Sequence, residues 1–210
     1  MELNWRLDEN ISTGLIGEVG IHQIDNATWI LRQRPLAVTG FGQVVLWRDG
    51  REVPDTVQAV FEYPAGVRLM YDATLTSSFD GAYEMFYGSD STIMLRDSKG
   101  WMFKEVDAPL LGWEVYARKD TFYREKGIAL VANATKLEAQ GLDPAADDPN
   151  VETPLYYALE AFADNLVFGP YEPAASYQVG YEATVVAIKA NEAISENKRV
   201  ELDPALFELG

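Results

Sequence analysis

The sequence contains no cysteine, only one histidine (His22) and no long hydrophobic run. Without thiols the chain can form neither a disulfide nor a cysteine-based zinc site, and it has no thiolate nucleophile. No stretch approaches the ~20 apolar residues of a membrane span. The N-terminal MELNWRLDEN also lacks the basic and apolar regions of a signal peptide. We therefore expect a soluble protein without a membrane partner, in a compartment that these absences leave open.

Basic residues are scarce as well, with 17 Lys and Arg against 33 Asp and Glu and a formal net charge of -16. This charge repels phosphate backbones, which excludes nucleic acid as a partner. Hydrophobic residues make up 48% of the chain and aromatic residues 12%, which is typical of a folded globule. A chain of 210 residues can bury a sizeable core, and we expect one domain over residues 1–210.

Residues 13–32 show the apolar spacing of a helix, which Pro35 would close. Gly17 and Gly20 lie inside this predicted helix, where each glycine costs about 1 kcal/mol relative to alanine. We therefore expect another part of the protein to approach the backbone closely at these glycines.

Between residues 36 and 105 the period changes to β-branched and aromatic runs separated by Gly and Pro turns, which predicts an antiparallel meander of five or six strands. The predicted strands are 44–47, 57–61, 67–75, 83–86, 92–95 and 101–103. After residue 109 the pattern predicts helices over 128–140, 153–167 and 174–195, a surface loop over 142–154, and a final strand over 199–202 that rejoins the sheet. This layout predicts the α+β class, a large, mostly antiparallel open sheet with helices packed on one face.

The chemical candidates on the first helix are Glu18, His22 and Asp25, which fall within an arc of ~60° on one helix face. A carboxylate that orients an imidazole suits proton transfer to or from a hydroxyl, so His22 with Glu18 is a candidate general acid/base pair. An exposed helix face without chemistry remains the commoner explanation of this spacing. A metal site is the weakest alternative, because the two-histidine pattern of a helical zinc site is missing.

Trp5 offers a flat aromatic ring, and the guanidinium of Arg6 offers several N–H donors in a fixed geometry. This combination suits the binding of sugar hydroxyls or carboxylates. The alternative is a surface arginine beside a core tryptophan. The aromatic side chains of the strands belong to the core or to an oligomer interface on the sheet.

Two glycine-rich segments need to be weighed as dinucleotide sites: the glycines at 14, 17 and 20, and Gly40-Phe41-Gly42. The dinucleotide fingerprint is GxGxxG directly after a strand and at the start of a helix, within a βαβ unit. Neither segment has this context, so we expect no NAD site of the usual kind in this chain.

Three segments in order resemble the C-terminal domain of the Gfo/Idh/MocA oxidoreductases, the family of glucose-fructose oxidoreductase and inositol dehydrogenase. They are NWRLDENISTGLIGEVGIHQIDNATWIL, GVRLMYDATLTSSFDGAYEMFYGSDSTIMLR and GYEATVVAIKANEAISENKRVEL. The most specific part is a carboxylate, three residues, a histidine, and a second carboxylate three residues later, which Glu18, His22 and Asp25 match.

The resemblance implies a fold like the C-terminal domain of glyceraldehyde-3-phosphate dehydrogenase, joined in the whole enzyme to an N-terminal Rossmann domain that holds NAD or NADP. It implies a sugar, polyol or related substrate, with His22 facing the nicotinamide and the reacting hydroxyl and Glu18 in place of the family's usual Asp. Arg6, Trp5 and Asp25 become candidate substrate contacts. The family's lysine, from a Glu-Lys-Pro motif late in the Rossmann domain, has no counterpart here.

By the same resemblance we expect a homo-oligomer formed through the open face of the sheet. The chain alone should bind no cofactor and should not turn over, because the Rossmann domain would precede Met1. The alternative function is a sugar-binding or oligomerisation module that has lost the redox chemistry.

Overall fold

In a computed structural model, the chain divides into two compact units, Met1–Phe79 with Glu172–Gly210, and Asp80–Tyr171. The structure describes residues 4–79, 81–96, 99–115, 117, 119–122, 125–130 and 152–209. We describe each unit separately.

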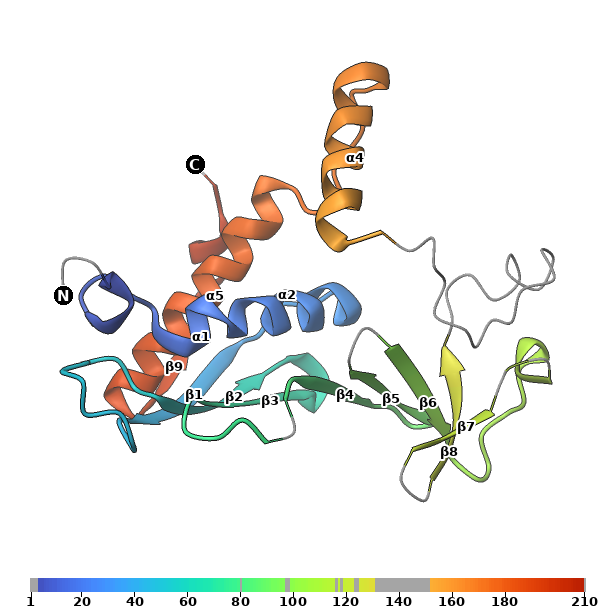
Figure 1. Ribbon diagram of the computed structural model, residues 1–210, viewed down its shortest axis with the longest axis horizontal. Coiled ribbons are helices and arrows are strands. Elements are labelled where there is room, and N and C mark those ends of the chain that lie inside the picture. The colour runs from blue at the N-terminus through green and yellow to red at the C-terminus, as the bar shows by residue number, and fades with distance from the viewer. Residues whose placement is uncertain are drawn as a thin grey trace. The chain divides into compact units, whose positions relative to one another are not determined.

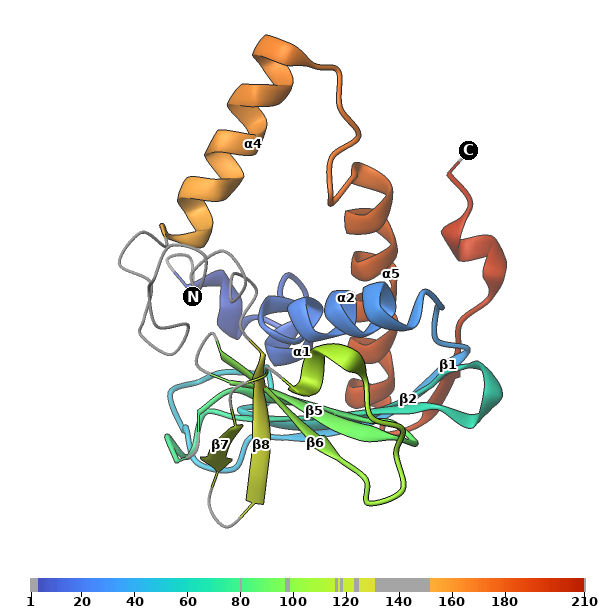
Figure 2. The ribbon, with the colours of Figure 1, turned by 90° about the vertical axis from the view of Figure 1, so that its right-hand side faces the viewer.

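The first unit is an antiparallel sheet with helices on one of its faces, as Figures 1 and 2 show. The strand order is β3-β2-β1-β9, and every pairing is antiparallel. In chain order its elements are η1 (Trp5–Leu7), α1 (Gly14–Glu18), α2 (Gly20–Leu31), β1 (Ala37–Gln43), β2 (Thr56–Glu62), η2 (Pro64–Gly66), β3 (Arg68–Thr74), α5 (Tyr177–Glu196), β9 (Arg199–Glu201) and η4 (Pro204–Phe207).

The core of this unit lies between the sheet and the helices. Along β2 the buried residues Val57, Ala59 and Phe61 alternate with more exposed ones, so only one face of the strand meets the helices. α5 presents a buried stripe to β1 that consists mostly of small residues: Ala183, Val186, Ala187, Ala190, Ala193 and Ile194. The small side chains let the α5 backbone approach the sheet closely.

This close approach explains an error in the predicted strands. The first strand is β1, and residues 44–47 are a loop. Gly40 and Gly42 lie within β1, although glycine is unfavourable in a strand. A Cβ on either glycine would lie 2.5 Å from a side-chain carbon of Ile194, so only glycine leaves room for α5.

The predicted helix over 13–32 is interrupted. It consists of α1 and α2, with Val19 between them at φ -123° and ψ -52°. Tyr71, on β3, lies against this break and its hydroxyl donates to the carbonyl oxygen of Leu15 over 3.3 Å. A Cβ on Gly20 would lie 2.9 Å from Tyr71 Cζ, which confirms that another side chain approaches the backbone there.

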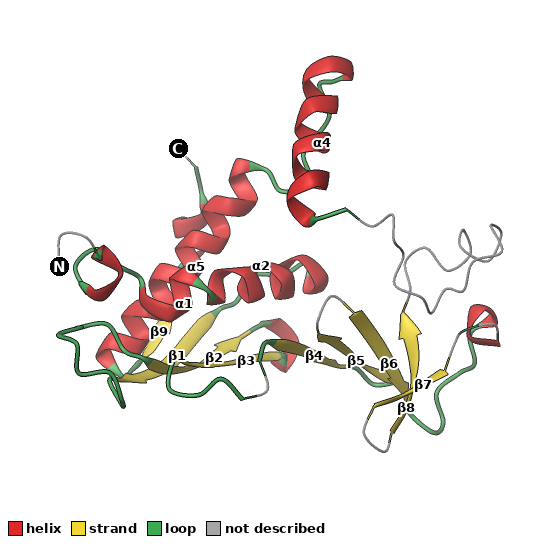
Figure 3. Cartoon of the chain, in the orientation of Figure 1, coloured by secondary structure: helices red, strands yellow, loops and turns green. Residues whose placement is uncertain are grey.

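The second unit contains a sheet of five strands with the order β4-β5-β6-β8-β7, again with antiparallel pairings (Figure 3). Its elements are β4 (Tyr83–Tyr87), β5 (Ser91–Arg96), β6 (Lys99–Lys104), η3 (Gly112–Val115), β7 (Lys119–Phe122), β8 (Glu125–Leu130) and α4 (Pro154–Phe168). The helix predicted over 128–140 is wrong for residues 128–130, which belong to β8, and its remainder lies outside the described residues. Most of the loop predicted over 142–154 lies outside them as well.

The predicted α+β class is confirmed, and so are its two last helices. α4 begins after Thr153, whose side chain accepts from the Tyr156 N–H, and α5 begins after Ser176, which accepts from the Val179 N–H. β9 rejoins the sheet as predicted, by pairing with β1. Among the described residues, none of the helices combines the length and apolar character needed to cross a bilayer.

Candidate functional site

Three of the predicted site residues meet at the start of the first unit. Arg6 lies in η1, a short 3-10 turn, and Glu18 is the last residue of α1. Arg6 Nε donates to Glu18 Oε2 over 3.2 Å, and the guanidinium carbon lies 4.5 Å from the centre of the Trp5 ring. The arginine therefore contacts both an indole and a carboxylate, and among the described residues no hydrogen bond uses its two Nη groups.

His22 lies in the first turn of α2 with its side chain exposed. Its backbone N–H donates to the carbonyl oxygen of Val19 over 3.2 Å. Within the described part of the chain no hydrogen bond joins its imidazole to Glu18, because the helix breaks between them and Glu18 binds Arg6 instead. The structure thus places Glu18 beside Arg6 and His22 on the neighbouring helix, where the sequence had predicted one continuous face.

Asp25, the fifth predicted residue, lines a cavity of about 650 Å³ between α2 and α5. Asp25, Asn26 and Trp29 approach it from α2, and Val179, Glu182 and Ala183 approach it from α5. Asp25 and Asn26 lie three and four residues after His22, and Trp29 lies four and three residues after them, so the four share one face of α2. The cavity therefore continues the helix face that carries His22.

The side chains considered above as a metal site, and the glycines considered as a dinucleotide site, do not have the geometry that such sites need. The described residues hold no group of three His, Asp or Glu side chains arranged to bind a metal ion. At Gly17 a Cβ would lie 1.7 Å from Thr13 Oγ1, and at Gly20 it would meet Ile16 and Tyr71. These glycines, like Gly40 and Gly42, admit the protein's own side chains and form no open cradle for a phosphate.

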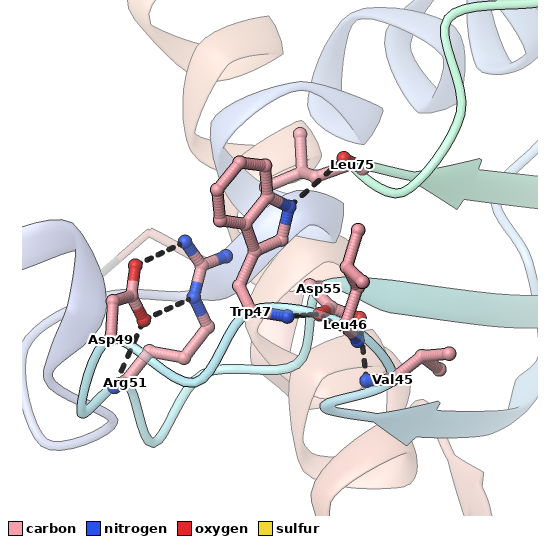
Figure 4. A network of polar contacts seen from close by, with 7 residues as sticks. All are labelled: Val45, Leu46, Trp47, Asp49, Arg51, Asp55 and Leu75. Atoms are coloured by element: carbon pink, nitrogen blue, oxygen red, sulfur yellow. Dashed lines mark hydrogen bonds and ion pairs between the residues drawn. The ribbon is translucent and has the colours of Figure 1, made fainter.

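Asp55, a buried carboxylate that the sequence did not single out, lies immediately before β2 (Figure 4). It accepts from the backbone N–H groups of Val45, Leu46 and Trp47 over 2.8 to 2.9 Å. Burial alone would raise the pKa of Asp55, but these donors outweigh it and hold the pKa at about 2. No local motif marks such a residue, because its partners are backbone groups eight to ten positions earlier.

The loop that Asp55 holds also connects to the candidate site. The N–H of Glu52, in this loop, donates to the carbonyl oxygen of Leu7 over 3.0 Å, next to Trp5 and Arg6. Arg51 pairs with Asp49, and the Trp47 indole donates to the carbonyl oxygen of Leu75 over 3.0 Å. Figure 4 shows the contacts of Asp55, Arg51 and Trp47, in which the Asp55 carboxylate and the carbonyl oxygen of Leu75 both hold the loop. The loop in turn supports η1.

The fold is that of known oxidoreductases. An aldose-aldose oxidoreductase from Caulobacter crescentus, complexed with glycerol, matches with a TM-score of 0.65 at 14% identity, over 94% of this chain and 50% of that one. A levoglucosan dehydrogenase in complex with NADH and L-sorbose matches with a TM-score of 0.67 at 16% identity, over 95% of this chain and 53% of that one. The chain thus spans about half the length of these proteins, and at such identities the likeness concerns the fold alone.

The N-terminal part of the chain matches a family model in sequence. Residues 1–94, which carry Trp5, Arg6, Glu18, His22 and Asp25, match the family model described as the GFO/IDH/MocA C-terminal domain. No curated protein gives a significant match. The predicted resemblance to this family is therefore confirmed for residues 1–94, and over the rest of the chain the likeness is one of fold.

Proposed function

We propose that this chain forms the substrate-binding half of an NAD(P)-dependent oxidoreductase that acts on a sugar, a polyol or a related hydroxyl compound. The observation that carries the proposal is the cluster of Trp5, Arg6 and Glu18, with the exposed His22 four residues after Glu18, within the segment that matches the family model. The substrate class is supported by two proteins of similar fold, an aldose-aldose oxidoreductase and a levoglucosan dehydrogenase.

In this proposal the residues bind the substrate and move a proton. The Nη groups of Arg6 donate to substrate hydroxyls. The bond from Arg6 Nε to Glu18 and the contact with the Trp5 ring fix the orientation of the guanidinium group. His22 accepts the proton of the reacting hydroxyl or returns it in the reverse reaction. Asp25 accepts hydrogen bonds from hydroxyls farther along α2.

The nicotinamide cofactor, which accepts or donates the hydride, would be held by a Rossmann domain outside these 210 residues. The strand pairings among the described residues are antiparallel, and side chains of the protein itself fill the space beside Gly17, Gly20, Gly40 and Gly42. Neither arrangement supplies the parallel βαβ unit and phosphate loop on which a dinucleotide normally binds. The 50 to 53% coverage of the neighbours agrees with a second domain of similar size.

The test compares His22→Ala with the unchanged enzyme after this chain is joined to its Rossmann domain, with NADH formation from a panel of sugars and polyols as the readout. Loss of general acid/base catalysis lowers turnover by about 10²- to 10⁴-fold. The free energy of unfolding should change by less than about 0.5 kcal/mol, because the side chain is exposed. Glu9→Gln, an exposed substitution outside the cluster, is the control and should leave turnover unchanged.

Two results would contradict the proposal. Turnover in His22→Ala equal to that of the unchanged enzyme would remove His22 from the chemistry. A micromolar NAD or NADP site on the 210-residue chain alone, measured by calorimetry, would overturn the assignment of the cofactor to another domain.

A second function, assembly of the protein into homo-oligomers, is favoured by the uncovered face of the first sheet. Phe41, Val60 and Met70 point away from the helices, on three neighbouring strands, and are exposed. Exposed apolar residues gathered on one sheet face are typical of an interface. We infer that two copies of the chain meet through this face, whether or not the domain takes part in redox chemistry.

A further inference from the structure

The cavity between α2 and α5 has the size and composition of a ligand site. Its volume of about 650 Å³ falls within the range of small-molecule pockets. At its edge Trp29 exposes 73% of its surface, which is unusual for so large an apolar side chain. The indole at the edge of this cavity offers a flat apolar face on which a ring can stack.

The cavity lies next to the proposed reaction site on the same helix. Asp25 lines the cavity and is three residues from His22, less than one helical turn. Trp29 follows His22 by seven residues, two turns along the same face, which corresponds to about 10.5 Å at 1.5 Å per residue. This distance is close to the span of two linked sugar rings, so a molecule that reacts at His22 reaches Trp29 only if it has more than one ring.

The charges of the lining favour a neutral ligand. Arg32 and Arg34 line the cavity together with Asp25 and Glu182, so their formal charges cancel in a protein whose net charge is -16. Arg34 is already neutralised, because its Nε donates to Glu182 Oε2 over 2.8 Å and a second bond joins the same two side chains. The carboxylate of Asp25 and the amide of Gln33 provide hydrogen-bonding groups for hydroxyls.

We propose that this cavity is a second subsite, which binds the ring farther from the reacting hydroxyl in a disaccharide or glycoside, with Trp29 as its stacking platform. The inference rests on the proposed function, because it places the reacting ring at His22. It makes the substrate larger than a single sugar: one ring at Arg6 and His22, and its neighbour between α2 and α5. Trp29 then determines specificity and takes no part in the chemical step.

The experiment reads binding at Trp29 directly. The chain contains five tryptophans, so the ¹⁵N-labelled protein has five indole N–H signals, and Trp29→Phe identifies that of Trp29 by its disappearance. Cellobiose, maltose and lactose are titrated separately, with glucose as the single-ring comparison. At least one disaccharide should shift the Trp29 signal saturably and bind about tenfold more tightly than glucose, which corresponds to about 1.4 kcal/mol.

Trp29→Ala should weaken binding of that disaccharide by about tenfold, whereas Trp113→Ala, which removes an exposed tryptophan outside the cavity, should leave it unchanged. In the enzyme joined to its Rossmann domain, Trp29→Ala should raise KM for the disaccharide and leave kcat unchanged. The subsite is overturned if no disaccharide shifts the Trp29 signal, if glucose shifts it equally well, or if Trp29→Ala binds as tightly as the unchanged chain. The binding experiment needs no cofactor, so its failure is distinguishable from a failure of hydride transfer.

Discussion

Arg6 and Glu18 are twelve residues apart in sequence, yet Arg6 Nε lies 3.2 Å from Glu18 Oε2. This bond joins η1 to the end of α1, and among the described residues the carboxylate of Glu18 bonds Arg6 and not the histidine with which it was expected to pair. Glu18 is therefore a positioning residue in the proposed site: it acts on the substrate through the direction that it gives to Arg6.

Glu18→Gln should change substrate binding more than folding. Arg6 is 60% exposed and Glu18 24%, and an exposed pair of this kind contributes less than about 1 kcal/mol to stability. In the joined enzyme we expect KM to rise by about three- to tenfold with a smaller effect on kcat, and Arg6→Lys to act in the same direction. Steady-state kinetics and denaturant titrations measure the two effects. A drop in stability with unchanged KM would show that the bond serves folding alone.

Gly40→Ala should destabilise the first unit by about 2 to 4 kcal/mol. The added Cβ would lie 2.5 Å from Ile194 Cγ1 and 3.1 Å from the backbone nitrogen of Ile194, so α5 itself has to move. Gly180→Ala is the matched control within α5, where a Cβ meets nothing within 4 Å and should stabilise by about 0.5 to 1 kcal/mol. Denaturant titration of both variants measures the difference, and equal stability would refute the packing argument.

These glycines also show how far the sequence predicts the fold. β2, β3, α4 and α5 follow from apolar spacing and capping residues, which act locally. β1 was missed because its glycines are favourable only once α5 lies against them. The break at Val19 was missed for a similar reason, since it lies against Tyr71, more than fifty residues away. The site residues could be named from sequence, but the Arg6–Glu18 bond and the cavity depend on that tertiary packing.

Asp55→Ala should cost about 2 to 4 kcal/mol, because the N–H groups of Val45, Leu46 and Trp47 lose their acceptor in one step. Asp72→Ala is the control: Asp72 is an exposed carboxylate on β3 that, among the described residues, accepts from the Gln58 side chain and from no backbone N–H, and its loss should stay within about 0.5 kcal/mol. Urea unfolding followed by tryptophan fluorescence reports both. If the two variants are equally stable, the Asp55 carboxylate does not anchor the loop.

The same carboxylate gives the protein a defined dependence on acid. The pKa of Asp55 is about 2 in the folded chain against an ordinary value of 3.8, so the unfolded state binds the proton more readily. Its contribution is complete above about pH 5 and is lost as the pH falls through about 4 towards 2. The stability difference between the unchanged chain and Asp55→Asn should therefore shrink over that interval. A difference that stays constant between about pH 6 and pH 2.5 would contradict the assigned ionisation.

The uncovered face of the first sheet should respond to a charge at its most exposed apolar residue, Met70, which exposes 80% of its surface. In a two-fold interface each copy presents the same patch, so Met70→Glu brings two carboxylates into an apolar contact with Phe41 and Val60. We expect this variant to weaken self-association by more than about tenfold, as measured by sedimentation velocity at several concentrations. Val67→Glu places the same charge just before β3, outside the face, and should associate like the unchanged chain. An unchanged chain that remains monomeric at about 100 μM would refute the interface, because a stable contact of about 800 Å² per partner holds at that concentration.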